Sequence, residues 1–163
     1  MLLAKFRQVD YARLIGVHMG TDIHIYGNAK KMFGTEPWAI TLGSHVHITD
    51  GVRFVNHDGG TLIFRDSIPD LEITKRITVG DYVYIGIETV ILPGVKIGNH
   101  CVIGARSVVT RDIPDNSVAV GVPARVIEST EEYLEKLKEN SLHVGDLKGI
   151  EKDRRLREML GER

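Results

Sequence analysis

The sequence contains a single cysteine, Cys101, among its 163 residues. One cysteine cannot form an intramolecular disulfide bond, so we expect a protein of a reducing compartment, the cytoplasm. An excess of charge is also missing, because 21 Lys and Arg face 22 Asp and Glu and the formal net charge is -1. This balance gives no indication of a nucleic-acid or anionic-membrane partner.

Long apolar runs are missing as well. No stretch approaches the ~18 apolar residues that a membrane-spanning helix needs, and the apolar part of residues 1–6 is too short for a signal peptide. Hydrophobic residues nevertheless make up 42% of the chain, which excludes a disordered protein. The length predicts about one domain with a core of its own.

The composition changes near residue 129. Residues 129–163 contain 17 charged side chains in 35 positions, whereas 14 of the 17 glycines lie before them. The segment Ser129-Thr130-Glu131-Glu132 has the spacing of a helix cap, and apolar residues then recur at helical spacing, with a second helical stretch from about Leu147 to Leu160. We therefore expect a β domain over residues 1–128 and a helical tail over residues 129–163.

A six-residue repeat runs through the first part. An aliphatic residue recurs at every sixth position, glycine often follows it, and a small or β-branched residue comes four positions later. The aliphatic positions of the longest run are Val79, Ile85, Ile91, Ile97, Ile103 and Val109. A period of six fits neither a helix nor a simple strand, but it fits a coil of short strands in which three strands make one 18-residue triangular turn.

The repeat is interrupted twice, between Ala29 and Leu42 and in a polar loop at about residues 59–78. Insertions in solenoids form loops on one face, which is often the binding face. His57 lies at the mouth of the second loop, at an outward-facing place of the repeat. A histidine with an ordinary pKa of ~6.5 can accept a proton near neutral pH, although a plain surface histidine is the alternative.

The sequence resembles the hexapeptide-repeat acyltransferases, and within them the maltose, galactoside and capsular-sugar O-acetyltransferase branch. The resemblance covers residues 13–128 and is carried by five blocks, which are residues 82–86 (YVYIG), 91–98 (ILPGVKIG), 102–105 (VIGA), 108–114 (VVTRDIP) and 121–127 (GVPARVI). It implies an all-β solenoid, a left-handed parallel β-helix, followed by the α-helical tail. It also implies a homotrimer with active sites between subunits.

The same resemblance implies the chemistry. An acetyl group would pass from acetyl-CoA directly to a hydroxyl of a sugar or surface-polysaccharide precursor, in a ternary complex with His57 as general base. The residues expected along the pantetheine arm are Tyr84, Gly86, Gly104 and Ala105, and those expected near the coenzyme's phosphates are Thr110, Arg111 and Arg125. Cys101 falls at an inward place of the repeat, so we expect it in the core and not as an acyl carrier.

Three residues are candidates for binding the acceptor: Glu36, Asn56 and Asp58. Glu36 has two other interpretations, as a residue that orients His57 and as a simple turn residue. The sequence departs from the branch at Glu128, where a basic residue is expected. It also departs at residues 30–33, which hold no counterpart of the branch's acceptor-binding asparagine. The acceptor itself, and whether the acyl group is acetyl or longer, stay open.

Three other functions remain as alternatives. The first is an N-acetyltransferase of an amino sugar on the same coil. The second is a zinc protein resembling the gamma-type carbonic anhydrases, which requires three converging histidines. That family has two histidines five residues apart and this sequence has none so spaced, so we expect no metal. The third is a non-catalytic trimeric scaffold, against which the joint presence of His57, Thr110, Arg111 and Arg125 argues.

Overall fold

The computed structural model describes residues 2–162, and the side chains of residues 8–162. Met1 and Arg163, the outer ends of the two predicted parts, lie outside the described residues. The chain forms two compact units, of which the first ends at Thr130 and the second begins at Glu131.

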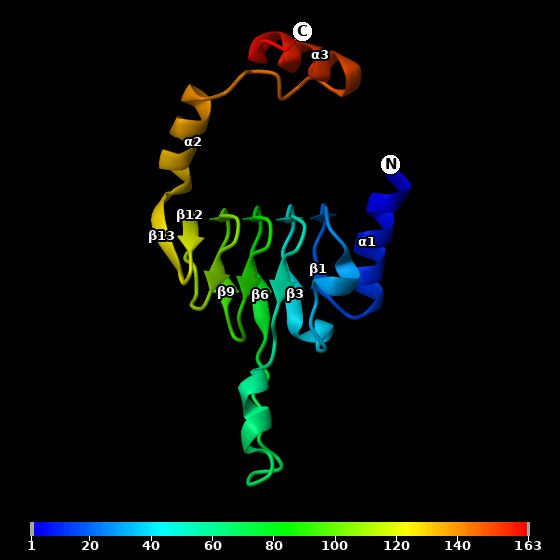
Figure 1. Ribbon diagram of the computed structural model, residues 1–163, viewed down its shortest axis with the longest axis vertical. Helices are drawn as coiled ribbons and strands as arrows, with labels where there is room; N and C mark the ends of the chain where they lie inside the picture. The colour runs from blue at the N-terminus through cyan, green and yellow to red at the C-terminus, as the bar shows by residue number, and fades with distance from the viewer. Residues whose placement is uncertain (1, 163) are drawn as a thin grey trace. The chain divides into compact units, whose positions relative to one another are not determined.

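The first unit consists of very short strands in three sheets (Figure 1). In chain order the strands are β1 (His18–Met19), β2 (His24–Ile25), β3 (Ile40–Leu42), β4 (His47–Ile48), β5 (Arg53–Phe54), β6 (Ile77–Val79), β7 (Tyr84–Ile85), β8 (Val90–Ile91), β9 (Lys96–Ile97), β10 (Val102–Ile103), β11 (Val108–Val109), β12 (Ser117–Gly121) and β13 (Ala124–Ser129). The sheets have the orders β1-β3-β6-β9, β2-β4-β7-β10-β12-β13 and β5-β8-β11. From β1 to β12 every pairing is parallel.

The pairing register shows that the chain coils. Tyr84 pairs with Val102, and Val90 pairs with Val108, so each partner lies 18 residues further along the chain. Consecutive strands β6, β7 and β8 belong to three different sheets, and β9 returns to the first. One turn of the coil therefore consists of three six-residue segments, as the repeat predicts.

The repeat builds the core because its aliphatic residue points inward in every segment. All six aliphatic residues from Val79 to Val109 are at most 1% exposed, which confirms this part of the prediction. Cys101 is fully buried, and burial raises the pKa of its thiol. Its Sγ donates a hydrogen bond to the Pro114 carbonyl, so Cys101 packs in the core as expected.

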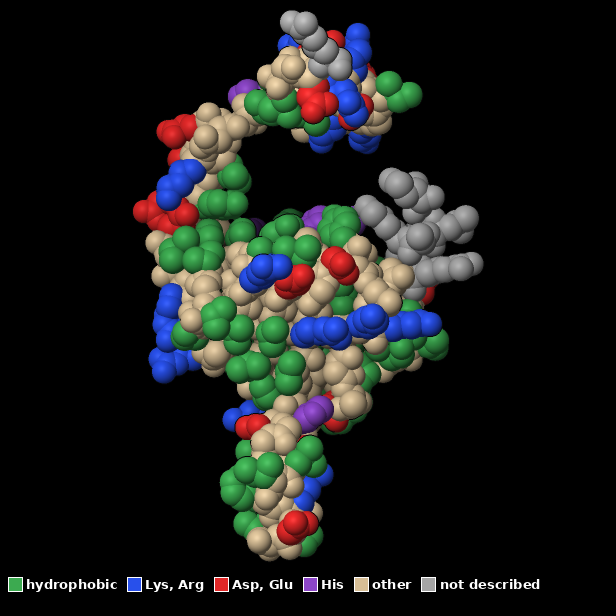
Figure 2. Space-filling model, viewed as in Figure 1, with side chains coloured by type: hydrophobic (Ala, Val, Ile, Leu, Met, Phe, Trp, Pro, Cys, Tyr) green, Lys and Arg blue, Asp and Glu red, His purple; other side chains and the backbone are tan. Residues whose placement is uncertain are grey.

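Both interruptions of the repeat are insertions into single turns. The partners of β1 and β3 are 23 residues apart, and those of β3 and β6 are 37 residues apart. The first insertion contains the 3₁₀ helices η1 (Ala29–Lys31) and η2 (Pro37–Ala39), and the second contains η3 (Gly59–Phe64). The coil resumes at Ile77, within the last residues of the predicted loop. This second insertion projects from the body of the unit (Figure 2).

The sequence analysis missed the elements that close the two ends of the coil. Helix α1 (Leu2–Leu14) precedes the first strand, so the part predicted as all-β begins with a helix. Ala12 of this helix is fully buried in the core, and the Gln8 side chain accepts a hydrogen bond from the backbone of Ala29. At the other end, β13 returns antiparallel to β12. Solenoids need such caps because their terminal turns have no further turn to pack against.

The second unit contains helix α2 (Thr130–Glu139), except for its first residue, and helix α3 (Gly149–Leu160), close to the stretches predicted from the tail. Glu131 and Glu132 occupy the first turn of α2, where carboxylates are favoured by the helix dipole. Gly161 ends α3 with φ of 75°, a conformation that glycine adopts without strain. Among the described residues, no helix has the length and apolarity required to cross a membrane.

The buried repeat positions predict that alanine substitutions at neighbouring residues differ greatly in their effect on the free energy of unfolding. We expect Ile97→Ala to lower the free energy of unfolding by about 2–5 kcal/mol, because it leaves a cavity where Ile97 is fully buried. Lys96→Ala, at the exposed neighbouring position, should change it by no more than about 0.5 kcal/mol. Urea unfolding followed by circular dichroism at one fixed protein concentration measures both, and equal effects would contradict the packing.

Candidate active site

His57 is held at the base of the second insertion by backbone hydrogen bonds on both sides. The Asp58 amide donates to the Ile73 carbonyl at 2.9 Å, and the Lys75 amide donates to the Asn56 carbonyl at 2.8 Å. Between them, His57 forms an antiparallel bridge with Thr74. The insertion therefore leaves and re-enters the coil through a hydrogen-bonded neck, and His57 is part of that neck.

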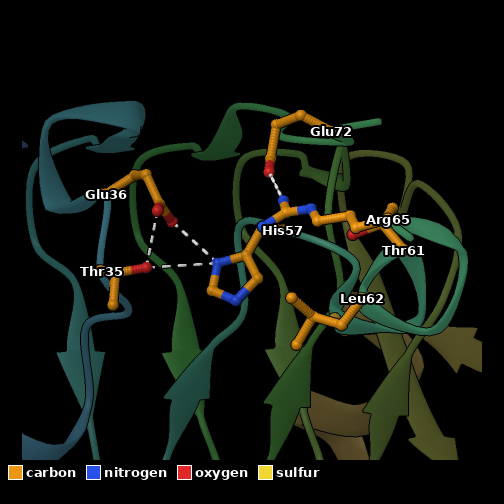
Figure 3. A pocket seen from close by; sticks show the side chains of 8 residues that line it. Thr35, Glu36, His57, Thr61, Leu62, Arg65 and Glu72 are labelled. Carbon is orange, nitrogen blue, oxygen red and sulfur yellow. Dashed lines mark hydrogen bonds and ion pairs between the residues drawn. The ribbon is translucent and has the colours of Figure 1, made fainter. Parts of the chain in front are cut away.

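The imidazole of His57 faces a carboxylate from the first insertion (Figure 3). Its Nδ1 lies 2.9 Å from Oε2 of Glu36 and 3.3 Å from Oγ1 of Thr35. The Thr35 hydroxyl donates to Oε1 of the same carboxylate at 2.6 Å. This arrangement places a proton on Nδ1, because a carboxylate can only accept, so Nε2 carries the lone pair in the neutral form of the ring. Nε2, which then carries the lone pair, has no hydrogen-bond partner among the described residues.

A pairing between adjacent turns explains why Glu36 reaches His57. Phe33 forms a parallel bridge with Phe54, and their rings stack with centroids 5.2 Å apart. Glu36 and His57 each follow their phenylalanine by three residues, so they occupy equivalent places on adjacent turns. The first insertion thus supplies a fourth strand position beside β5 and delivers Glu36 in register with His57.

The environment of Glu36 holds its carboxyl group in the ionised form. Partial burial raises its pKa, but the hydrogen bonds from Thr35 and His57 and the attraction of the His57 ring outweigh burial, and the pKa lies below its ordinary value. At neutral pH the group is therefore a carboxylate. A carboxylate on Nδ1 fixes the tautomer of the ring and stabilises the imidazolium that forms when Nε2 takes a proton.

The ring lines an open pocket of about 230 Å³ between the body of the coil and the insertion. The insertion contributes Thr61, Leu62, Arg65 and Glu72 to its lining (Figure 3). Arg65 and Glu72 form an ion pair with each other. The His57 side chain is 38% exposed, so a small molecule can approach Nε2 from this pocket.

The other two predicted acceptor residues have different surroundings. Asn56 is fully buried, and neither its Nδ2 nor its Oδ1 has a hydrogen-bond partner among the described residues. Asp58 is exposed and caps η3, where its side chain accepts a hydrogen bond from the Gly60 amide. Of the three candidates, Glu36 alone contacts His57 through its side chain, and acceptor binding by any of them stays a prediction.

The residues expected along the pantetheine arm come together at one corner of the coil. Tyr84 is exposed on β7, and Ala105 is exposed beyond β10, the strand that pairs with β7. Gly86 is buried, and a Cβ at this position would lie 2.5 Å from the backbone nitrogen of Ala105. A Cβ at position 104 would likewise lie 2.6 Å from the Val120 side chain. The stacking of the turns itself therefore requires these two glycines.

The residues expected near the coenzyme's phosphates are exposed at the C-terminal end of the first unit. Thr110 and Arg111 directly follow β11, and Arg125 lies on β13. The Arg125 guanidinium donates one hydrogen bond to the Ala124 carbonyl, which leaves donors for a ligand. Exposed guanidinium groups fit phosphate binding. Glu128, which replaces an expected basic residue, lies on the same strand β13.

Four of the remaining histidines stack with tyrosines on the surface of the coil. The stacked rings are His24 with His47 and Tyr26, and Tyr82 with His45 and His100. The Asp22 carboxylate accepts from both His24 and His45, at 2.8 and 2.7 Å, and these hydrogen bonds lower its pKa. Within residues 2–162, no group of three or more His, Cys, Asp or Glu side chains is arranged to hold a metal ion.

The sequence analysis did not name Thr35, Leu62, Arg65 or Glu72. Thr35 stands next to Glu36, and the match of Phe33 to the aliphatic place of Phe54 was a signal that would have paired the two segments. The three insertion residues carry no such signal, because the insertion does not follow the repeat.

Comparison with known proteins identifies the family of this chain. A model of the bacterial transferase hexapeptide family, with six repeats, matches residues 76–111. Protein CapG of Staphylococcus aureus is 46% identical over 151 residues, which cover 93% of this chain and 88% of CapG. The chain belongs to the hexapeptide transferase family. A second relative of this hexapeptide transferase is the galactoside O-acetyltransferase of Escherichia coli (strain K12), which is 40% identical over 117 residues. That match covers 66% of this chain and 54% of the relative, so the chain spans about half of that protein's length.

Solved structures show the same fold. A hexapeptide-repeat acetyltransferase from Vibrio cholerae superposes with a TM-score of 0.59 at 26% identity, over 77% of this hexapeptide transferase and 80% of that chain. A galactoside acetyltransferase in complex with coenzyme A superposes with a TM-score of 0.56 at 25% identity, over 89% and 87% of the two chains.

The lowered pKa of Glu36 predicts a pH-dependent contribution to stability. A carboxylate whose folded pKa lies below its unfolded value of about 4.3 stabilises the fold above that value, and loses the contribution as the pH falls through the folded pKa. We expect Glu36→Gln to lower the free energy of unfolding by about 1 kcal/mol at pH 7, and to have a smaller effect at about pH 3, below the unfolded pKa. Urea unfolding at both pH values tests this.

The matched control for this experiment is Glu88→Gln, since Glu88 pairs with Arg106 on the exposed surface. Exposed pairs contribute little, so this variant should match the wild type at both pH values. A stability loss for Glu36→Gln that is equal at pH 7 and pH 3 would contradict the ionised pair.

Proposed function

We propose that the protein is an acetyl-CoA-dependent O-acetyltransferase that acetylates a hydroxyl of a sugar or surface-polysaccharide precursor. The observation that carries the proposal is the Glu36–His57 pair, which leaves Nε2 of the histidine open to a pocket on a hexapeptide-repeat coil. Membership of a family with O-acetyltransferases among its members supports the choice of reaction.

The proposed chemistry needs one base and no covalent enzyme intermediate. The acceptor oxygen attacks the thioester carbonyl carbon while Nε2 of His57 takes the hydroxyl proton. The C–S bond then breaks, the acetyl ester is released, and the coenzyme A thiolate receives the proton from the imidazolium. Glu36 acts as a positioning residue, because its carboxylate holds Nδ1–H and stabilises the transient positive charge on the ring. Cys101 takes no part, since it is fully buried.

The donor is proposed to run along the C-terminal turns of the coil. Tyr84 and Ala105 are exposed at the corner where the pantetheine arm would lie. At Gly86 and Gly104 adjacent turns of the coil are too close together to admit a side chain. Thr110, Arg111 and Arg125 would bind the phosphates. The solved galactoside acetyltransferase that superposes on 89% of this chain contains coenzyme A, which supports this donor.

We further propose the assembly that the family resemblance implies. The coil would be a left-handed β-helix, and three copies would associate with an active site in each groove between subunits. The open side of the His57 pocket supports a site completed by a neighbouring copy. The buried free thiol of Cys101 supports a cytoplasmic location, where thiols stay reduced.

The role of His57 predicts the result of removing its ring. We expect His57→Ala to lower kcat by roughly 10²–10⁴-fold, since it deletes the general base. Glu36→Gln should lower kcat by a smaller factor and leave the KM for acetyl-CoA unchanged, because it only weakens the support of the ring. Release of coenzyme A thiol in the presence of sugar acceptors measures both.

His100→Ala is the matched control, because His100 is an exposed histidine in the stacked column outside the pocket. It should retain wild-type kcat. Near-normal turnover by a folded His57→Ala protein would refute the assignment of His57.

The proposed donor site predicts that coenzyme binding can be measured without an acceptor. Isothermal titration should show that the protein binds acetyl-CoA and coenzyme A. Arg111→Ala and Arg125→Ala should each weaken binding by about tenfold, through loss of a charge-assisted hydrogen bond to phosphate. Arg106→Ala, which removes an exposed arginine paired with Glu88, should leave affinity unchanged. A folded protein that binds neither ligand would exclude the acetyltransferase function.

A further inference from the structure

A second groove meets the pocket at His57. It has a volume of about 560 Å³, and Thr35 and His57 line both spaces. The groove is lined on one side by η1 and the residues that follow it, and on the other by the residues from β5 to the neck. Its lining consists of residues 30–35 and 53–57. A molecule in this groove therefore lies next to the ring that would accept the proton.

The groove differs from the pocket in charge. Lys30, Lys31 and Arg53 line it, and no Asp or Glu stands among its lining residues. The pocket, in contrast, contains Glu36 and Glu72. Three cations without a carboxylate make the groove a favourable place for an anion.

The basic side chains are only partly engaged within the chain. The Arg53 guanidinium donates one hydrogen bond to the Lys31 carbonyl, which holds the group beside η1 and leaves its other N–H donors available. The Lys30 ammonium lies 5.8 Å from the centroid of the Tyr11 ring. The Lys31 side chain is exposed and has no ion-pair partner among the described side chains of residues 8–162.

The same groove contains an unusual buried amide. Asn56 is fully buried, yet Nδ2 and Oδ1 have no partner among the described residues. Buried polar groups are nearly always hydrogen-bonded, because leaving one unpaired costs free energy. Both amide atoms are enclosed by the protein, so Asn56 lies beside the groove without exposing its side-chain nitrogen or oxygen to it.

We propose that the acceptor is an anionic sugar, whose carboxylate or phosphate group binds Lys31 and Arg53 while a neighbouring hydroxyl reaches His57. This inference rests on the acetyl transfer proposed above and specifies its acceptor. Lysine and arginine form charge-assisted hydrogen bonds with either anion, so a uronic acid and a sugar phosphate share the required chemistry. The phosphates of the donor are assigned to Thr110, Arg111 and Arg125, which leaves this groove to the acceptor.

Matched acceptors test the proposal by steady-state kinetics. D-Glucose, D-glucuronate and glucose 1-phosphate differ in charge but share a hexose ring. We expect kcat/KM to be about tenfold or more higher for one of the anionic acceptors than for glucose. A preference for glucuronate identifies a carboxylate as the bound group, and a preference for glucose 1-phosphate identifies a phosphate.

Lys31→Gln should remove this preference. It should raise the KM of the anionic acceptor about tenfold, by loss of one charge-assisted contact, and leave the KM for acetyl-CoA and the use of glucose unchanged. Lys96→Gln, at an exposed lysine on β9, is the control and should behave like the wild type.

Two kinetic results would overturn the proposal and leave acetyl transfer intact. The first is equal use of neutral and anionic acceptors that Lys31→Gln does not alter. The second is a Lys31→Gln protein with a raised KM for acetyl-CoA, since the groove would then belong to the donor. Failure of the wild-type protein to bind acetyl-CoA would instead count against the proposed function.

A binding measurement decides the matter if none of the three sugars is acetylated. In backbone amide NMR spectra, glucuronate or glucose 1-phosphate should shift the signals of Arg53 and Asn56 in the wild type, and glucose should not. Lys31→Gln should reduce those shifts. Spectra in which neither anion perturbs these residues would overturn the proposal.

Discussion

The stacking of one turn of the coil on the next is the interaction on which the rest of the structure depends. Each strand is only two or three residues long over most of the coil and has no stability of its own, so it persists because its backbone pairs with the turns on either side. Ile85 illustrates this, since it pairs with Ile48 on one side and Ile103 on the other and is fully buried. A turn can receive extra residues only where the inserted chain closes on itself and returns in register.

That constraint positions the site. The second insertion closes through the hydrogen bonds of Asp58 to Ile73 and of Lys75 to Asn56, which place His57 in a hydrogen-bonded neck. The first insertion keeps Phe33 in register with Phe54, so Glu36 arrives on the same edge of the coil. Two interruptions that are separate in the sequence therefore meet at one histidine, and each supplies what the other lacks. One provides the proposed base, and the other provides the carboxylate that binds its Nδ1.

The seven histidines show that the position of a histidine in the coil determines which groups its ring contacts. His24 and His47 lie on adjacent turns of one sheet and stack on each other, and His45 stacks on Tyr82 in the same manner. The register between stacked turns creates such columns wherever ring-bearing residues occupy equivalent places on adjacent turns, even where an insertion separates the turns along the chain. His57 lies outside them because the insertion begins there, and its ring faces a pocket with a carboxylate on one nitrogen.

The sequence by itself determined the coil, because a six-residue period of aliphatic residues has one solution that buries all of them. It also made His57 the candidate base, through its place at the edge of an interruption and the family resemblance, and it predicted the helical tail through a change in charge density. Other features were decided only in three dimensions. The capping helix α1 has no strong pattern of its own and is specified by the open end of the core that buries Ala12. The pairing of Glu36 with His57 and the basic groove beside the unpartnered Asn56 depend on contacts between turns. Spacing along the chain does not encode such contacts, because insertions of arbitrary length separate the residues that meet.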